Sequence, residues 1–143
     1  MTRRGDTVIR TDVQLEQFWR ELMGPLGFVR RAVWIALMED DGHVLRQIVE
    51  IGDLPRRPER GGLAGLADNL AGLSDDLGIH RFAFLLVRPG RGGAAPDDRA
   101  WAAELHRAAH AAGVRCETVH LATDTVLVPL PVDDLVGTDA LPD

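Results

Sequence analysis

Residues 88–93 read Arg-Pro-Gly-Arg-Gly-Gly and place two guanidinium groups among glycines, just before Asp97 and Asp98. Arginine binds carboxylates and phosphates, and glycine lets backbone N–H groups approach an anion. The segment follows an apolar run and precedes a helical pattern, where open α/β sheets often bind ligands. Arg88, Arg91 and Asp98 are therefore the first candidate residues for binding an anion or a partner. No Gly-Lys-Ser/Thr follows, and both aspartates would repel a phosphate, so a solvated turn whose aspartates cap the next helix is the alternative.

Three histidines are the next candidates. His106 and His110 stand four residues apart, a spacing that suits zinc, but a His-Glu-x-x-His protease needs a glutamate where this chain has Arg107. Both lie off the apolar stripe of their helical pattern, so we expect them to face solvent. His120 lies between two apolar residues of a predicted strand. It is either a structurally hydrogen-bonded histidine or, in an enzyme, an acid or base alongside Asp98.

The remaining nucleophilic residues are few. The single cysteine, Cys116, excludes an internal disulfide and a thiolate-rich metal cluster, and we expect it to be a buried apolar residue. The single serine, Ser74, falls in a leucine-rich helical pattern and not in a nucleophile elbow, which excludes a serine hydrolase. The sequence thus predicts neither a bound metal nor a cofactor.

Length and charge narrow the class of protein. The 143 residues suit one domain, and an apolar fraction of 45% with 27% charged residues is typical of a globular chain. No apolar run approaches the roughly 18 residues of a membrane span, and no apolar run follows the first arginines as in a secretory signal. We therefore expect a cytoplasmic protein without membrane association. The net charge of -6 opposes nucleic-acid binding, and the sixteen basic residues, all arginine, indicate a GC-rich bacterial source.

Apolar periodicity predicts the elements that position these residues. The predicted helices cover residues 11–23, 63–77 and 98–112. The predicted strands cover residues 32–38, 43–51, 82–87, 114–121 and 125–130. The order α-ββ-α-β-α-ββ predicts an α/β domain whose mixed sheet is sandwiched between helices.

Two of the predicted strands, 32–38 and 82–87, are apolar on both faces and should be central neighbours. We expect Trp34 and Leu85 on these strands to share one core with Leu66 of the leucine-rich helix. The glycine-rich segment from Arg88 to Pro96 should be an exposed, mobile loop. One domain is expected over residues 1–135, and a flexible acidic tail over residues 136–143.

Five short matches occur in one order along the chain. Leu-Val-Arg-Pro-Gly at 86–90 and Ala-Pro-Asp-Asp-Arg at 95–99 stand where a known family has His-x-His-Pro-Ser-Gly and Ser-x-x-Asp before a helix that opens Asp-Arg. Val-His-Leu at 119–121, Val-Pro-Leu at 128–130 and Arg-Ala-Val-Trp at 31–34 stand where it has Asp-His-Leu, Val-Ser-Leu and Glu-Val-Phe. The chain thus resembles the RadC-like branch of the JAB/MPN metalloprotease superfamily over about residues 8–135. The resemblance implies a three-layer fold of the JAB/MPN or deaminase-like kind.

The departures from that family concern its metal site. In the superfamily two histidines and an aspartate hold zinc while a glutamate acts as general base. The corresponding residues here are Leu86, Arg88, Asp98 and Arg31, so only the aspartate is retained. One carboxylate does not replace three zinc ligands, and the fixed charge of an arginine repels the cation. The resemblance therefore implies a pseudo-enzyme without zinc.

Two classes of function follow. The first is a non-catalytic JAB/RadC-like scaffold that binds a partner protein or a second copy of itself around Arg88, Arg91 and Asp98. The alternative is an enzyme or sensor that binds a small anion at the loop from Arg88 to Gly93, with His120 or Asp98 as acid or base. A DNA-associated role is a third possibility, which the acidic net charge does not favour.

Overall fold

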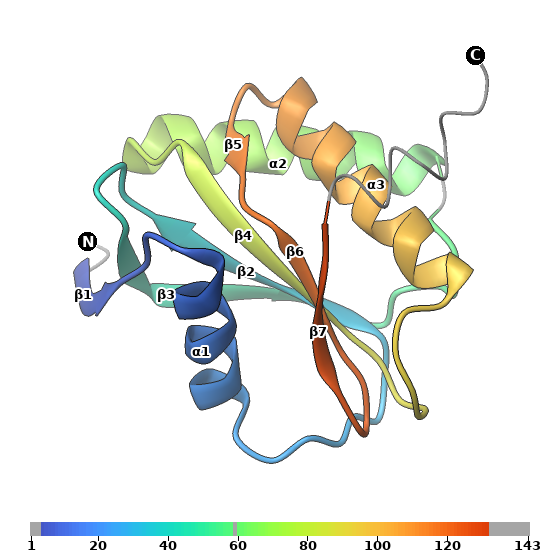
Figure 1. Cartoon of the computed structure of the whole chain (residues 1–143). Coiled ribbons are helices and arrows are strands. Elements are labelled where there is room, and N and C mark those ends of the chain that lie inside the picture. Colours follow the sequence, from blue (N-terminus) through green and yellow to red (C-terminus); the bar gives the residue numbers. More distant parts are fainter. Residues whose placement is uncertain (1–3, 59, 132–143) are drawn as a thin grey trace.

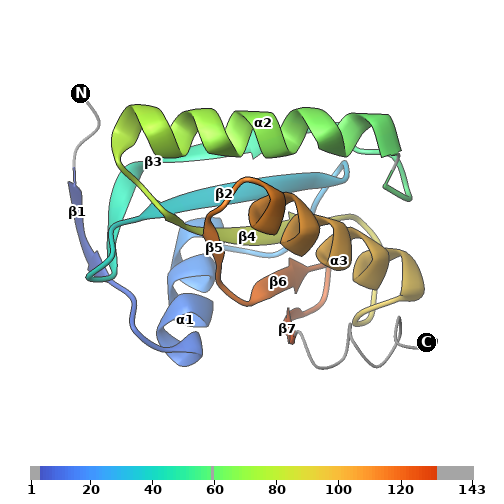
Figure 2. The same cartoon turned by 90° about the horizontal axis from the view of Figure 1, so that it is seen from above.

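The computed structural model describes residues 4–58 and 60–131, with side chains for residues 7–58 and 65–131. Its strands are β1 (Arg4–Val8), β2 (Ala32–Met38), β3 (His43–Ile51), β4 (Arg81–Val87), β5 (Arg115–Cys116), β6 (Val119–Ala122) and β7 (Leu127–Leu130). Its helices are α1 (Asp12–Met23), α2 (Arg60–Leu77) and α3 (Pro96–Ala111). The sheet is mixed, in the order β1-β3-β2-β4-β6-β7, with β5 paired to β4. Figure 1 and Figure 2 show α2 and α3 over one face and α1 over the other, so the α/β class and the helix-covered mixed sheet are confirmed.

Two apolar cores lie on opposite faces of the sheet. The α2-side core contains Leu66 and Leu70 of α2 together with Ile35 and Phe84. The α1-side core contains Leu15 and Trp19 of α1 together with Leu85. Side chains alternate between the faces along β2 and β4, and this alternation fills both cores from the same two strands.

The prediction that Trp34, Leu85 and Leu66 share one core is wrong. Trp34 is the direct neighbour of Leu85 across the β2–β4 pair, so both side chains lie on the α1 face. Leu66 belongs to the α2-side core, on the other face. The two strands are adjacent and α2 covers one of their faces, as expected, but a sheet separates the residues that the prediction joined.

Two strand assignments also differ from the sequence pattern. The sequence predicts no strand before α1, yet β1 pairs with β3 at the edge of the sheet. The segment Arg-Gly-Asp-Thr-Val has only one apolar residue, so backbone pairing at an edge leaves no apolar period to detect. The predicted strand over residues 114–121 is divided into β5 and β6, which Glu117 and Thr118 separate, although Glu117 N still donates to Phe82 O of β4 (2.9 Å).

Local signals near α1 and α2 have mixed outcomes. The capping box at the start of α1 is confirmed, since Gln14 N donates to Thr11 Oγ1 (3.1 Å) and Thr11 N donates to Gln14 Oε1 (3.1 Å). Helix α2 begins at Arg60, three residues before the predicted start. None of the described helices is long and apolar enough to cross a membrane. The predicted acidic tail, residues 136–143, lies outside the described residues.

Candidate functional site

Arg88 and Asp98 form a buried ion pair where β4 ends and α3 begins. Arg88 Nε donates to Asp98 Oδ1 (2.8 Å) and Nη2 donates to Oδ2 (2.9 Å). The side chain of Asp98 is fully buried and that of Arg88 is 11% exposed. The guanidinium also donates to the carbonyl oxygens of Pro89 and Gly93, both at 3.1 Å. Its bond to Asp98 raises the pKa of Arg88, so this residue stays charged and fully engaged inside the protein.

The two aspartates at the start of α3 act differently. Asp98 Oδ2 accepts a hydrogen bond from Ala95 N (2.8 Å), so Asp98 caps the start of α3, but from the third helical position and not from the N-cap, which is Ala95. Asp97 faces the other way and accepts from Arg57 Nε and Arg56 Nε, both at 2.9 Å. The hydrogen bond from Arg57 is the main cause that lowers the pKa of Asp97. Neither carboxylate therefore points free into a site.

The glycine-rich loop is fastened to the turn between β6 and β7. Gly90 N donates to Asp124 Oδ2 (2.8 Å) and its carbonyl accepts from Asp124 N (2.9 Å). Gly92 N donates to Thr125 Oγ1 (2.9 Å), and Gly92 O accepts from Thr123 Oγ1 (2.8 Å). The sequence predicts exposure from Arg88 to Pro96, and residues 89–93 and Pro96 are exposed, whereas Arg88, Ala94 and Ala95 are partly buried. The predicted mobility of this loop stays a prediction, and the hydrogen bonds to the β6–β7 turn argue against it.

Asp124 is the residue of this site that the sequence reasoning did not single out. Its Oδ1 accepts from Phe28 N (2.9 Å), so one carboxylate joins the turn, the loop before β2 and the glycine-rich loop. The hydrogen bonds from Gly90 and Phe28 lower the pKa of Asp124. The only sequence signal for this role is Thr-Asp-Thr between two strands, since these residues bond backbone groups in turns.

Arg31 directly precedes β2 and lies at the same end of the sheet. Its Nη1 donates to the carbonyl oxygen of Arg56 (2.8 Å). Burial lowers the pKa of Arg31, Asp98 opposes this shift, and Arg88 adds to it, so all three charges lie within electrostatic range of one another. Leu86, two residues before Arg88, is fully buried in the α2-side core. The four residues matched to the family's base and zinc ligands thus lie at one end of the sheet as two guanidiniums, one carboxylate and one leucine.

The other two candidate residues lie apart from the ion pair. His120 is 1% exposed on β6 and pairs with Leu85, whose side chain belongs to the α1-side core. Its Nδ1 lies 3.2 Å from the carbonyl oxygen of Thr118, and burial lowers the pKa of His120. Arg91 is exposed at the tip of the loop. Of the named candidates on this loop, Arg91 is the one a partner would meet directly.

The remaining candidates are His106, His110 and Cys116. His110 is exposed as expected, but His106 is half-buried, and its Nε2 is enclosed without a hydrogen-bond partner in the described part of the chain. Burial lowers the pKa of His106. Cys116 is partly buried against the α2-side core, and burial raises the pKa of its thiol to about 12. At neutral pH that thiol is protonated and a poor nucleophile.

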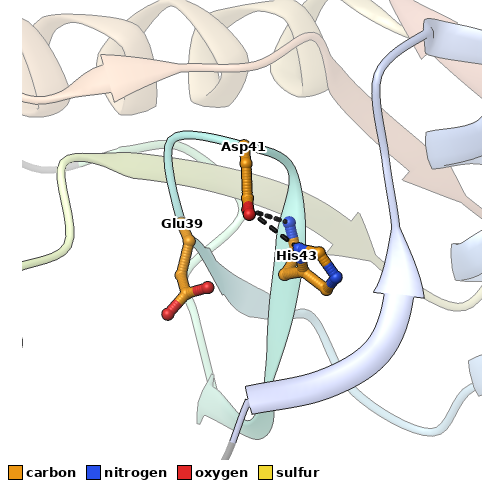
Figure 3. A group of neighbouring side chains, drawn as sticks. All are labelled: Glu39, Asp41 and His43. Atoms are coloured by element: carbon orange, nitrogen blue, oxygen red, sulfur yellow. Dashed lines mark hydrogen bonds and ion pairs between the residues drawn. The ribbon is translucent and has the colours of Figure 1, made fainter.

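One group of possible metal ligands occurs among the described residues, far from Arg88. Glu39, Asp41 and His43 lie at the β2–β3 hairpin, with one ligand atom of each within 4.8 Å of the others. Figure 3 shows Asp41 bonded to both the backbone and the ring of His43. These bonds are His43 N to Asp41 Oδ1 (3.0 Å) and His43 Nδ1 to the same oxygen (2.9 Å). The arrangement is that of an aspartate stabilising its own turn.

Comparisons with known proteins add no family to these observations. No protein-family model matches the chain, and no curated protein matches it. The functional argument is therefore built on the geometry of Arg88, Asp98 and their neighbours.

Proposed function

We propose that this chain is a non-catalytic, cytoplasmic protein-interaction domain of the JAB/RadC-like kind, a pseudo-enzyme whose former reaction centre now has a structural role. The observation that carries the proposal is the buried Arg88–Asp98 pair. An arginine occupies a position where the resemblance implies a zinc ligand, and it takes both oxygens of the aspartate at another such position. With Arg31 close by, the local charge repels a cation.

The alternative, an anion-binding enzyme or sensor, receives less support. Anion sites in glycine-rich loops use free backbone N–H groups and free guanidinium donors. Gly90 N and Gly92 N already donate to the β6–β7 turn, and Arg88 already donates to Asp98 and to two carbonyl oxygens. An anion would have to displace these internal acceptors. His120 lies on the opposite face and adds no acid or base to this loop.

The proposed contact surface is the exposed tip of the loop with the arginines beside it. Arg91 is exposed, and the side chains of Arg56 and Arg57 are 84% and 80% exposed while their Nε atoms bond Asp97. Arg88 and Asp98 then act from within, because they hold the loop and the start of α3 in one shape. Arginine is enriched at protein interfaces, where its planar head binds carboxylates and carbonyls.

The test combines partner capture with an anion titration. The purified chain is cross-linked in native extract, and captured proteins are compared for the wild type, Arg91→Glu and the control Arg10→Glu, which reverses an exposed arginine before α1. We expect one stoichiometric partner that Arg91→Glu loses and Arg10→Glu retains. Capture that is equal for all three chains would contradict the proposed surface. A melting temperature that rises with inorganic phosphate for the wild type, but not for Arg91→Glu, would restore the anion-binding alternative.

A further inference from the structure

The outer side of β3 is paired along only part of its length by the strands that the structure describes. β1 pairs with β3 at His43 and Leu45, and the inner side of β3 pairs with β2 up to Ile51. Within residues 4–58 and 60–131, no strand pairs with the outer side of Ile48–Ile51. An edge of this kind presents alternate N–H and C=O groups that can pair with another extended chain.

Apolar hollows flank this edge on both faces of the sheet. The α2-side hollow, of about 420 Å³, is lined by Val49, Ile51, Leu66 and Leu73, with Asp68 and Asp76 at its rim. The α1-side hollow, of about 310 Å³, is lined mainly by apolar side chains, with Thr7 of β1 and Arg46 at its polar margin; the apolar ones are Phe18, Leu22, Val44, Leu45 and Ile48. Since side chains of a strand alternate between faces, a strand added beside β3 would direct one set into each hollow. The edge and the two hollows together have the layout of a strand-addition site.

The charge at the rim selects the occupant. Asp68 and Asp76 are exposed, and neither has an ion-pair or hydrogen-bond partner among the described residues. A second copy of the chain paired edge to edge would bring two acidic α2 surfaces together, each with Asp68, Asp75 and Asp76. Residues 132–143 of the same chain carry four aspartates, and they follow β7 at the opposite edge of the sheet. Like charge disfavours both of these occupants.

We propose that the edge of β3 binds an extended segment of a partner protein in which lysines or arginines alternate with apolar residues. The apolar side chains enter the α1-side hollow. The basic side chains lie over the α2-side hollow, where their aliphatic stems cover Val49 and Leu73 and their cationic heads reach Asp68 and Asp76. This surface is distinct from the loop around Arg91, so the inference goes beyond the proposed function.

Two glycines of α2 provide a matched pair of variants. Gly72 lines the α2-side hollow, and a Cβ added there meets no atom within 4 Å. Gly72→Leu therefore adds a side chain at the hollow with open space around its Cβ, and it replaces a weak helix former with a strong one. Gly65 lies on the same helix, is exposed, and has equally open space, but it does not line the hollow. Gly65→Leu is thus the control for a change of helix propensity and surface hydrophobicity.

The probe is the peptide acetyl-Lys-Val-Lys-Val-Lys-Val-Lys-amide, titrated into isotope-labelled protein and followed by amide chemical shifts. We expect shifts centred on Ile48–Ile51, at least tenfold weaker binding to Gly72→Leu, and affinity within about twofold of the wild type for Gly65→Leu. The double variant Asp68→Asn with Asp76→Asn should weaken binding about three- to tenfold, an effect that salt reduces, as for exposed ion pairs. A fully N-methylated peptide and one with glutamate in place of lysine should not bind.

Three outcomes would overturn the inference. Equal binding to Gly72→Leu and Gly65→Leu would place the peptide elsewhere, and equal binding of the N-methylated peptide would exclude strand pairing. A wild-type dimer in sedimentation that Gly72→Leu dissociates would make a second copy the occupant. Each of these results leaves the capture experiment with Arg91→Glu unaffected, so failure at the β3 edge is distinguishable from failure of the proposed function.

Discussion

The end of β4 and the outer edge of β3 differ in how many of their polar groups are free to bind a partner. At the end of β4, Arg88, Asp98 and Asp124 direct their charges at one another and at loop backbone, and the polar groups there are satisfied internally. At the edge of β3, backbone groups and two apolar hollows have no partner among the described residues, and Asp68 and Asp76 carry free charge. Residues that suggest chemistry in the sequence thus stabilise the structure, while a segment without reactive residues offers a binding surface. Residue type alone therefore does not identify a binding site, because a polar group that is already bonded within the protein is not free to bind a partner.

Removal of Asp98 should produce the largest effect on stability. Asp98→Ala leaves the Arg88 guanidinium almost buried without its partner and removes the acceptor of Ala95 N. Breaking a buried pair in this way costs about 3 to 5 kcal/mol of unfolding free energy. Urea denaturation measures the loss, and Arg91→Ala, an exposed change on the same loop, should stay within about 0.5 kcal/mol of the wild type. A loss for Asp98→Ala as small as for Arg91→Ala would mean that the pair is not a structural element.

Truncation of Leu66 tests the packing beneath the α2-side hollow. Leu66 is buried on the face of α2 that packs on the sheet, so Leu66→Ala should destabilise the protein by about 2 to 5 kcal/mol in urea denaturation. Val13→Ala on α1 is the control, because Val13 is 80% exposed. A cost below about 0.5 kcal/mol for Leu66→Ala is typical of surface changes. It would contradict the packing of α2 on the sheet, and the α2-side hollow depends on that packing.

The buried histidines should make stability depend on pH. Burial lowers the pKa of His120 and of His106 from 6.5, so folding favours the neutral form of both rings. The contribution of these histidines to the free energy of unfolding is fully present above their pKa in the unfolded chain. It is lost as the pH falls toward their lower pKa in the folded chain, because the unfolded chain takes up the proton first. Each group contributes at most about 1.4 kcal/mol per pH unit. Urea denaturation at pH 7, 6 and 5 should show a smaller slope for His120→Gln, and an unchanged slope would contradict the burial of a neutral ring.

Zinc should have the smallest effect, which is none. Protein purified without a histidine tag should hold no stoichiometric zinc, and its melting should not respond to chelator or to micromolar zinc. A ligand specific for the folded state would add about 2.7 kcal/mol at a hundred times its dissociation constant. One zinc per chain whose loss follows Asp98→Asn would restore the metal-hydrolase reading. Zinc whose loss follows His43→Gln instead would assign it to the hairpin trio.

The features that the sequence predicts correctly are either local contacts or strongly apolar segments. The capping box of Thr11 and Gln14 lies within one helical turn, and β2 and β4 are apolar runs, so both are readable from short windows. The candidate ion pair was found only as two separate residues, because their mutual bond depends on how β4 and α3 meet. Asp124 bonds Phe28, 96 residues away in the chain, and no local pattern encodes such a contact. The face of Trp34 was missed because an all-apolar strand does not show which side each residue takes.

Amide hydrogen exchange of one sample compares the two regions most directly. We predict slow exchange for the amides of Gly90, Gly92, Ala95 and Phe28, because each donates to Asp124, Thr125 or Asp98, and fast exchange for the outward-facing amides of Ile48–Ile51. Asp98→Asn should speed exchange in the first set and leave the second unchanged. Fast exchange at Gly90 and Gly92 in the wild type, together with protection along Ile48–Ile51, would contradict the account, because the glycine-rich loop would then be the open region and the β3 edge the closed one.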